Sequence, residues 1–218
     1  MQTRQYNQDK QFGDFFLRTR VRFYDEKIIA QELTDPYRIP DNPKFVLDVG
    51  SHIGITALMA AKKGALVQCY EPNYDNFQVL NYNITRNNLN DKIKTFNYGV
   101  GKPGKTKLYL HPSASGTHSS YLQQKGLTDD NYEVVDFISI RDVFYKNTYI
   151  DHCDLLKLDC EGSEADIIND LDDDLAFKIK QISVEFHDKK LMPALIAKLE
   201  KWYTVEHLKR YEYTFYKK

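Results

Sequence analysis

The chain is organised around the run Lys44-Phe45-Val46-Leu47-Asp48-Val49-Gly50-Ser51-His52-Ile53-Gly54. Its apolar first half predicts a buried parallel strand, and Ile55 to Ala61 after it predict a helix of good helix formers. Gly50 allows a backbone conformation that side chains disfavour, or the close approach of a ligand, and Gly54 lets the helix start pack closely on the strand. A strand, a glycine turn and a helix N-terminus form the nucleotide-binding corner of a doubly wound sheet.

The next apolar run, Ala65 to Tyr70, ends on Glu71, where an acid can accept hydrogen bonds from both hydroxyls of a ribose. The dinucleotide fingerprint G-x-G-x-x-G is absent, and Asp48 would repel a pyrophosphate. A cofactor without phosphate fits better, and S-adenosylmethionine suits acids at both positions. A glycine turn that serves only packing would leave the position of Glu71 unexplained.

Bulk properties place the chain among ordinary globular proteins. Its 218 residues predict one domain. The 30 basic and 31 acidic residues indicate neither a polyanionic partner nor a membrane surface. Three cysteines without close spacing predict a reducing compartment, with no disulfide framework and no zinc site. No run resembles a secretion signal or approaches a membrane span, so we expect a cytoplasmic protein.

The pattern divides the chain at residue 44. Residues 1–43 form an extension in which Phe15 to Tyr24 predict a strand and Asp25 to Leu33 a short helix capped by Asp25. This extension is either a lid on one edge of the sheet or part of the acceptor pocket. Residues 44–218 alternate strands and helices, which predicts an α/β fold with a doubly wound, mostly parallel sheet.

The elements after Glu71 continue this pattern. Asn73 to Leu89 predict a helix with Asn73 as its N-cap, and Lys92 to Tyr98 a strand. Asn97 and Tyr98, at the end of that strand, are candidates to face the adenine. Further strands are expected over 106–110, 133–138, 154–158 and 179–186, helices over 139–144 (capped by Ser139) and 191–201, and a C-terminal antiparallel hairpin over 202–208 and 211–216.

Residues 111–130 interrupt the alternation with a loop rich in Ser, Gly, Thr and Asp. A loop of this length in a compact domain is either functional or mobile. Two interpretations stay open. The loop is an exposed polar segment, or it is a flap over the cofactor or acceptor that carries His118, Ser119 and Ser120.

A second informative stretch reads Asp154-Leu155-Leu156-Lys157-Leu158-Asp159-Cys160-Glu161-Gly162-Ser163-Glu164. Its apolar strand places Asp159 and Glu161 at the carboxyl end, where ligands bind in open α/β sheets. The strand over Ile179 to Phe186 brings Glu185 and His187 to the same edge. Packing does not require four titratable groups there, so we treat all four as catalytic candidates.

Other acids have simpler explanations. Glu164 and Asp166 lie in the first turn of a helix, where negative charge is favourable. Asp172-Asp173-Asp174 predicts a solvated loop rather than a metal site. The sequence assigns no metal ligands and leaves open whether a divalent metal assists.

His187 is the candidate general base. A neutral imidazole, with a pKa near 6.5, can take a hydroxyl proton as the methyl bond forms. Glu185, on the same face of the strand, would fix its tautomer or bind acceptor hydroxyls. Alternatively His187 only caps the following helix, which leaves Asp159, Glu161 and Glu185 as candidates.

Four segments resemble the FkbM-type methyltransferases, namely Val46-Leu47-Asp48-Val49-Gly50-Ser51-His52-Ile53-Gly54, Tyr70-Glu71-Pro72-Asn73, Leu156-Lys157-Leu158-Asp159-Cys160-Glu161-Gly162-Ser163-Glu164 and Val184-Glu185-Phe186-His187. The resemblance runs from about Tyr37 to His187. It implies a class I methyltransferase (Rossmann-like) fold, S-adenosylmethionine as donor, and methylation of a hydroxyl on a sugar, glycan or natural product.

The resemblance also implies the cofactor site: Asp48, Gly50, Ser51, Gly54 and Glu71, with Asp159 beside the methionine end. His52 and Cys160 depart from the usual family residues. Neither should abolish binding, and we keep His52 among the cofactor-binding candidates. The segments that often define the acceptor match weakly, so acceptor identity does not carry over.

Two other functions stay open. An RNA methyltransferase shares a similar glycine turn, but the balanced charge and the Asp-Cys-Glu-Gly element disfavour it. A non-catalytic S-adenosylmethionine-binding module would bind cofactor without forming product. We expect a small-molecule or glycan acceptor and no nucleic-acid partner.

Overall fold

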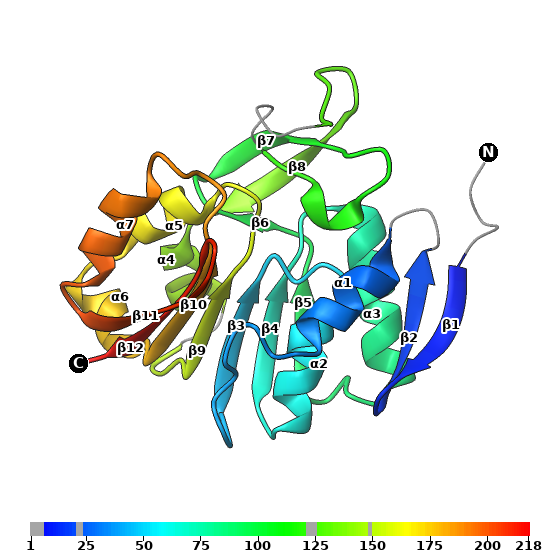
Figure 1. Cartoon of the computed structure of the whole chain (residues 1–218), viewed down its shortest axis with the longest axis horizontal. Helices are drawn as coiled ribbons and strands as arrows, with labels where there is room; N and C mark the ends of the chain where they lie inside the picture. The colour runs from blue at the N-terminus through cyan, green and yellow to red at the C-terminus, as the bar shows by residue number, and fades with distance from the viewer. Residues whose placement is uncertain (1–6, 21–23, 121–125, 148–149) are drawn as a thin grey trace.

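A computed structural model describes residues 7–20, 24–120, 126–147 and 150–218 (Figure 1). The predicted α/β fold is confirmed. A seven-stranded sheet has the order β11-β12-β10-β9-β3-β4-β5. Its strands are β3 (Phe45–Val49), β4 (Leu66–Tyr70), β5 (Ile93–Phe96), β9 (Leu155–Leu158), β10 (Gln181–Glu185), β11 (Tyr203–Lys209) and β12 (Glu212–Lys217).

The five strands from β10 to β5 are parallel, and β12 pairs antiparallel with both β10 and β11. The predicted C-terminal hairpin at the sheet edge is therefore confirmed. From β3 the chain adds β4 on one side of the sheet, and from β9 it adds β10 on the other side. The strand order therefore reverses between β3 and β9. Ligands bind at such a switch point in open α/β sheets.

Helices cover both faces of this sheet. They are α1 (Asp25–Glu32), α2 (Ile55–Lys62), α3 (Tyr74–Arg86), α4 (Ile140–Asp142), α5 (Glu164–Asp170), α6 (Asp173–Lys178) and α7 (Met192–Leu199), with a single π turn η3 (Val143–Asn147) after α4. Val46 packs in the core with α1, α2 and α3, whereas its neighbour Leu47 packs in the core with α4 to α7. Successive strand residues point to opposite faces, so the continuous apolar strands bury both sides.

Two capping predictions are confirmed. The Asn73 side chain accepts a hydrogen bond from the main-chain N–H of Asn76, and Ser139 accepts one from Asp142. The prediction of a loop at Asp172-Asp173-Asp174 is wrong, because α6 begins there with Asp172 as its N-cap.

Within the described residues, no helix combines the length and the apolar character that a membrane span needs.

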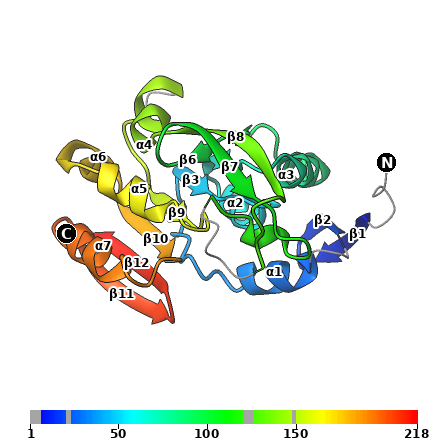
Figure 2. The ribbon, with the colours of Figure 1, turned by 90° about the horizontal axis from the view of Figure 1, so that it is seen from above.

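The N-terminal extension differs from its prediction. β1 (Asn7–Phe12), which was not predicted, pairs with β2 (Phe15–Arg20). The strand expected over Phe15 to Tyr24 ends at Arg20, and residues 21–23 lie outside the described residues. Asp25 is not a cap: Tyr24 holds that position, and the Asp25 carboxylate accepts hydrogen bonds from Arg20. Figure 2 shows the β1–β2 and β11–β12 hairpins at opposite ends of the molecule.

A separate three-stranded sheet stands above the main sheet in Figure 1. It consists of β6 (Gly99–Val100), β7 (Gly104–Tyr109) and β8 (Tyr132–Ile138), in the order β6-β8-β7. The strands expected over 106–110 and 133–138 therefore pair with each other outside the main sheet. Between them lies the short 3-10 turn η2 (Ser115–Thr117), while residues 121–125 of the predicted loop lie outside the described residues.

Candidate active site

A cavity of about 730 Å³ lies at the carboxyl ends of the central strands. The glycine turn after β3, the end of β4, the turn after β9 and the end of β10 form its floor. Its walls come from α1 and the segment after it, from α3, from the three strands β6, β7 and β8, from η2 and the residues after it, and from the β11–β12 turn. The cavity lies at the switch point between β3 and β9. The predicted site residues that line it are Gly50, His52, Glu71, Asp159, Glu161, Glu185 and His187.

Asp48, a predicted cofactor ligand, is absent from the cavity lining. Its side chain is fully buried, and one carboxylate oxygen lies 3.2 Å from Lys157 Nζ, which also donates a hydrogen bond to the Gly50 carbonyl. Burial opposes the charge of Lys157, but the carboxylates of Asp48 and Asp159 raise the pKa of this lysine. Lys157 therefore supplies a positive charge beneath the glycine turn, and Asp48 is its partner.

Three other predicted ligands also lie outside the cavity lining and support the turn instead. The Ser51 hydroxyl donates to the main-chain carbonyl of Asp48 at 2.7 Å. Gly54 is the N-cap of α2 at φ 94°, where a Cβ would come within 2.5 Å of the Leu80 side chain. Asn97 donates its amide to the carbonyl of Glu71 at 2.9 Å. Direct cofactor contact by these residues stays a prediction.

Glu71 lines the cavity, and three donors hold its carboxylate. One oxygen accepts from the main-chain N–H of His52 at 2.8 Å. The other accepts from the N–H of Asn73 at 3.0 Å and from the Asn76 amide at 3.2 Å. Burial raises the pKa of Glu71 to about 7. A carboxylate accepts about four hydrogen bonds, so these three donors leave room for about one more. Hydrogen bonds from both ribose hydroxyls stay a prediction.

His52 joins the glycine turn to the N-terminal extension and to the segment after β7. Its Nε2 lies 2.8 Å from the Ser115 hydroxyl and 3.3 Å from Arg20. Burial, reinforced by the charge of Arg20, lowers the pKa of His52 to about 3, so the ring is neutral. Its Nδ1 is buried without a hydrogen-bond partner among the described residues.

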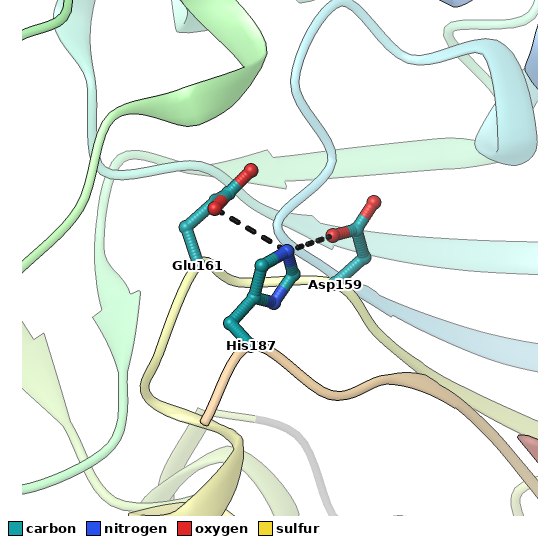
Figure 3. Close-up of side chains that lie close together, drawn as sticks. All are labelled: Asp159, Glu161 and His187. Carbon is teal, nitrogen blue, oxygen red and sulfur yellow. Dashed lines mark ion pairs between the residues drawn. The ribbon is translucent and has the colours of Figure 1, made fainter. Parts of the chain in front are cut away.

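His187 is the centre of an acidic cluster (Figure 3). Its Nδ1 lies 2.9 Å from Glu164 Oε1, and its Nε2 lies 3.3 Å from Glu161 Oε2 and 3.8 Å from Asp159 Oδ1. Burial opposes protonation of the ring, but these carboxylates raise the pKa of His187 to about 11.

The cluster bears on two expectations about His187. Its carboxylates favour the protonated ring, which has no lone pair with which to act as a base, so the base role of His187 stays a prediction. Its Nδ1 partner is Glu164 rather than Glu185. The alternative role as a helix cap is not observed either, because Asp188 accepts the N–H groups of Lys190 and Leu191 before α7.

Asp159 is held from the opposite side by the N-terminal extension. The Tyr37 hydroxyl donates to Asp159 Oδ2 at 2.6 Å. Although burial opposes it, the positive charges of Lys157 and His187 lower the pKa of Asp159. Asp159 is therefore an anion with one oxygen held by Tyr37 and the other facing His187.

Glu185 differs from the other acids of the site. It lines the cavity, and its carboxylate forms no hydrogen bond with another described residue. Burial and the nearby charge of Asp159 raise its pKa to about 7. A carboxyl group with such a pKa can accept a proton at neutral pH, which is the property expected of a general base.

The candidate residues that sequence reasoning missed are Tyr37, Lys157 and Glu164. Lys157 had a visible signal, because it is a lysine inside an otherwise apolar strand. Glu164 was explained as a helix-end acid, yet it is buried and accepts hydrogen bonds from the N–H groups of Cys160 and Gly162. Nothing local to Tyr37 indicates its partner.

The interpretation of residues 111–130 as a flap gains support, because five of its described residues line the cavity: Ser115, Gly116, Thr117, His118 and Ser120.

Comparison with known sequences finds similarity to methyltransferases. The Methyltransferase FkbM domain family matches residues 48–211. Methyltransferase 1 of Beauveria bassiana (strain ARSEF 2860) is 25% identical over 188 residues, which cover 78% of this chain and 75% of that protein. Methyltransferase sdnD of Sordaria araneosa is 22% identical over 209 residues, which cover 83% of this chain and 80% of that protein.

Solved structures share the fold. The precorrin-6y C5,15-methyltransferase of Geobacter metallireducens GS-15 has a TM-score of 0.52 at 12% identity, covering 94% of this chain and 95% of that one. A methyltransferase from Pyrococcus furiosus has a TM-score of 0.52 at 16% identity, covering 95% and 91%. The expected class I methyltransferase architecture is confirmed.

Proposed function

Because the chain belongs to the FkbM family of methyltransferases, we propose that it methylates a hydroxyl oxygen on a small molecule, a sugar or a glycan. The chain is an S-adenosylmethionine-dependent methyltransferase. One observation carries the proposal about the acceptor. A single cavity joins Glu71, which has room for one more hydrogen bond, to Glu185, whose pKa of about 7 suits proton transfer.

The chemistry of the cavity fits S-adenosylmethionine. Glu71 would accept a hydrogen bond from a ribose hydroxyl. His52 offers a buried ring nitrogen that has no partner among the described residues. The negative charge around the end of β9 suits the positive charge of the cofactor's sulfonium. The lining residues include no glycine-rich cradle for a pyrophosphate.

When bound, S-adenosylmethionine supplies a methyl group on a cationic sulfur, and the electron pair of the broken S–C bond stays with the sulfur. The acceptor hydroxyl loses its proton as its oxygen forms the new C–O bond. We assign that proton to the Glu185 carboxylate, because it lines the cavity with a pKa of about 7, whereas both ring nitrogens of His187 already face carboxylates. A general base contributes about a hundred- to ten-thousand-fold in rate, and good alignment of the reacting groups up to about 7–11 kcal/mol.

The walls of the cavity support a small or terminal acceptor. Its volume of about 730 Å³ lies within the range typical of small-molecule sites. The β11–β12 turn contributes Lys209, Arg210, Tyr211 and Glu212, whose polar groups suit a hydroxylated ligand. Ile28, Gln31, Glu32 and Tyr37 also line the cavity, which supports a role for the 1–43 extension in shaping the acceptor pocket.

The proposal is tested by incubating the protein with S-adenosylmethionine that carries a labelled methyl group, together with separated pools of small molecules, lipid-linked glycans and RNA. We expect label in a small-molecule or glycan fraction. The label should resist mild alkali, because a methyl ether is stable there and a methyl ester is not. Label in RNA would overturn the acceptor assignment. Cofactor binding without labelled product in any pool would favour a non-catalytic module.

A further inference from the structure

Three metal-binding side chains converge at the cavity wall. Asp159 and Glu161 follow β9, and His187 follows the adjacent strand β10 (Figure 3). One donor atom from each side chain lies within 4.8 Å of the other two. Ligands about 2.0–2.2 Å from a shared cation lie about 3.0–3.5 Å apart, and His187 Nε2 already lies 3.3 Å from Glu161 and 3.8 Å from Asp159.

Outer partners orient two of these donors. Glu164 occupies Nδ1 of His187 at 2.9 Å, which turns Nε2 toward the two carboxylates. Tyr37 occupies Oδ2 of Asp159 at 2.6 Å, which leaves Oδ1 on the side of His187. A carboxylate behind a histidine and a donor behind a carboxylate are the supports that metal ligands typically receive. These outer partners, Glu164 and Tyr37, are not themselves among the three converging side chains.

The charge around the group is also suited to a cation. Asp159, Glu161, Glu164 and Glu185 contribute carboxyl groups close to His187. Lys157, whose charge also acts on Asp159, is paired with Asp48. Three carboxylates face one imidazole here, and a divalent cation would balance two of them and permit a neutral histidine ligand.

We propose that Asp159, Glu161 and His187 form a divalent-cation site at the end of β9 and β10. One nitrogen and two carboxylate oxygens suit Mn²⁺ or a similar transition ion better than Ca²⁺, which prefers oxygen ligands alone. Three protein ligands leave coordination positions open toward the cavity. This role rests on the proposed function: the cation would hold the acceptor hydroxyl and lower its pKa, so that the hydroxyl loses its proton more readily during methyl transfer.

The test measures Mn²⁺ binding to the full chain after chelator treatment and dialysis, by the electron paramagnetic resonance signal of free Mn²⁺. We expect one site per chain. Glu161→Gln and His187→Gln should each weaken Mn²⁺ binding at least about tenfold, and Glu164→Gln by about 10–100-fold, the usual effect of losing an outer partner. Asp174→Asn, in an exposed acidic helix turn, is the matched control and should bind Mn²⁺ like the wild type.

Nuclear magnetic resonance makes the proposal testable even where a variant does not fold. Sub-stoichiometric Mn²⁺ should broaden the amide signals of residues 159–161 and 185–188 before those of α6. The absence of a stoichiometric site, broadening centred elsewhere, or unchanged Mn²⁺ affinity in the folded Glu161→Gln and His187→Gln variants would each overturn the metal site. Neither metal experiment uses cofactor or acceptor. A failure to find the metal site therefore leaves the proposed methyl transfer unaffected, and a failure of the labelling experiment leaves the metal site unaffected.

Discussion

A Cβ atom on Gly50 would lie 1.8 Å from the carbonyl oxygen of Asp159. Gly50 also has a φ of +76°, which disfavours any side chain. The glycine therefore lets the turn after β3 approach the turn after β9, which carries the acidic cluster. The positive φ of Gly50 matches the expected backbone conformation that side chains disfavour, and the backbone of a neighbouring strand end occupies the space beside it.

The first prediction follows from this contact. Gly50→Ala should lower the free energy of unfolding by more than about 3 kcal/mol, because backbone strain of about 1–3 kcal/mol adds to a clash with main-chain atoms. Gly64→Ala is the control. It has a φ of +103° but no atom within 4 Å of an added Cβ, so it carries the strain alone. Urea denaturation measures both variants, and equal losses would show that the contact with Asp159 is unimportant.

The second prediction concerns Glu71. Glu71→Ala should weaken the binding of S-adenosylhomocysteine by about 1–3 kcal/mol, because a charge-assisted hydrogen bond to the ribose is lost and the N–H of His52 loses its acceptor. Glu133→Gln, which changes an acid that contacts Asn73 outside the cavity lining, is the control. Calorimetry with S-adenosylhomocysteine and NAD measures the effect. We expect no NAD binding, and unchanged affinity in Glu71→Ala would remove Glu71 from the cofactor site.

The third prediction assigns the base. Glu185 must be deprotonated to accept a proton, so kcat should rise with pH and level off above about 7, the pKa of this carboxyl. Glu185→Gln should lower kcat at least about a hundredfold and remove this pH dependence, while cofactor affinity stays within about threefold. The measurement is a pH–rate profile of the wild type and of Glu185→Gln. A mutant profile that keeps the same inflection would assign the inflection to another group.

The fourth prediction concerns the charge of His187 in metal-free protein. Its pKa rises from 6.5 to about 11 on folding, so the charged cluster stabilises the fold fully below pH 6.5 and loses this contribution as the pH rises toward 11. The stability difference between the wild type and His187→Gln should therefore be larger at pH 6 than at pH 9.5, by up to about 1.4 kcal/mol per pH unit. Urea denaturation with a chelator present measures it. A difference that stays constant would mean that His187 is neutral in the folded protein.

The sequence alone determined the layout of the sheet and the edge at which the site lies. Apolar runs such as Val46 to Val49 and Leu155 to Leu158 predict buried strands, because a run buried on both faces needs no alternation. The Asn73 cap, the C-terminal hairpin and the meeting of β3, β4, β9 and β10 at one edge follow from local chemistry and from the handedness of parallel connections. The Gly50 turn and Glu71 were therefore placed correctly at the cavity.

Only the tertiary structure decided the roles of the charged groups at that edge. Asp48 faces Lys157 beneath the turn rather than the cavity, and Tyr37 reaches Asp159 from 122 residues away. His187 meets three carboxylates that raise its pKa to about 11, while Glu185 has a pKa of about 7. A pKa depends on burial and on charges within a few ångströms. A sequence pattern names the strand end at which a side chain lies, but the distances between side chains there arise only when distant segments pack together.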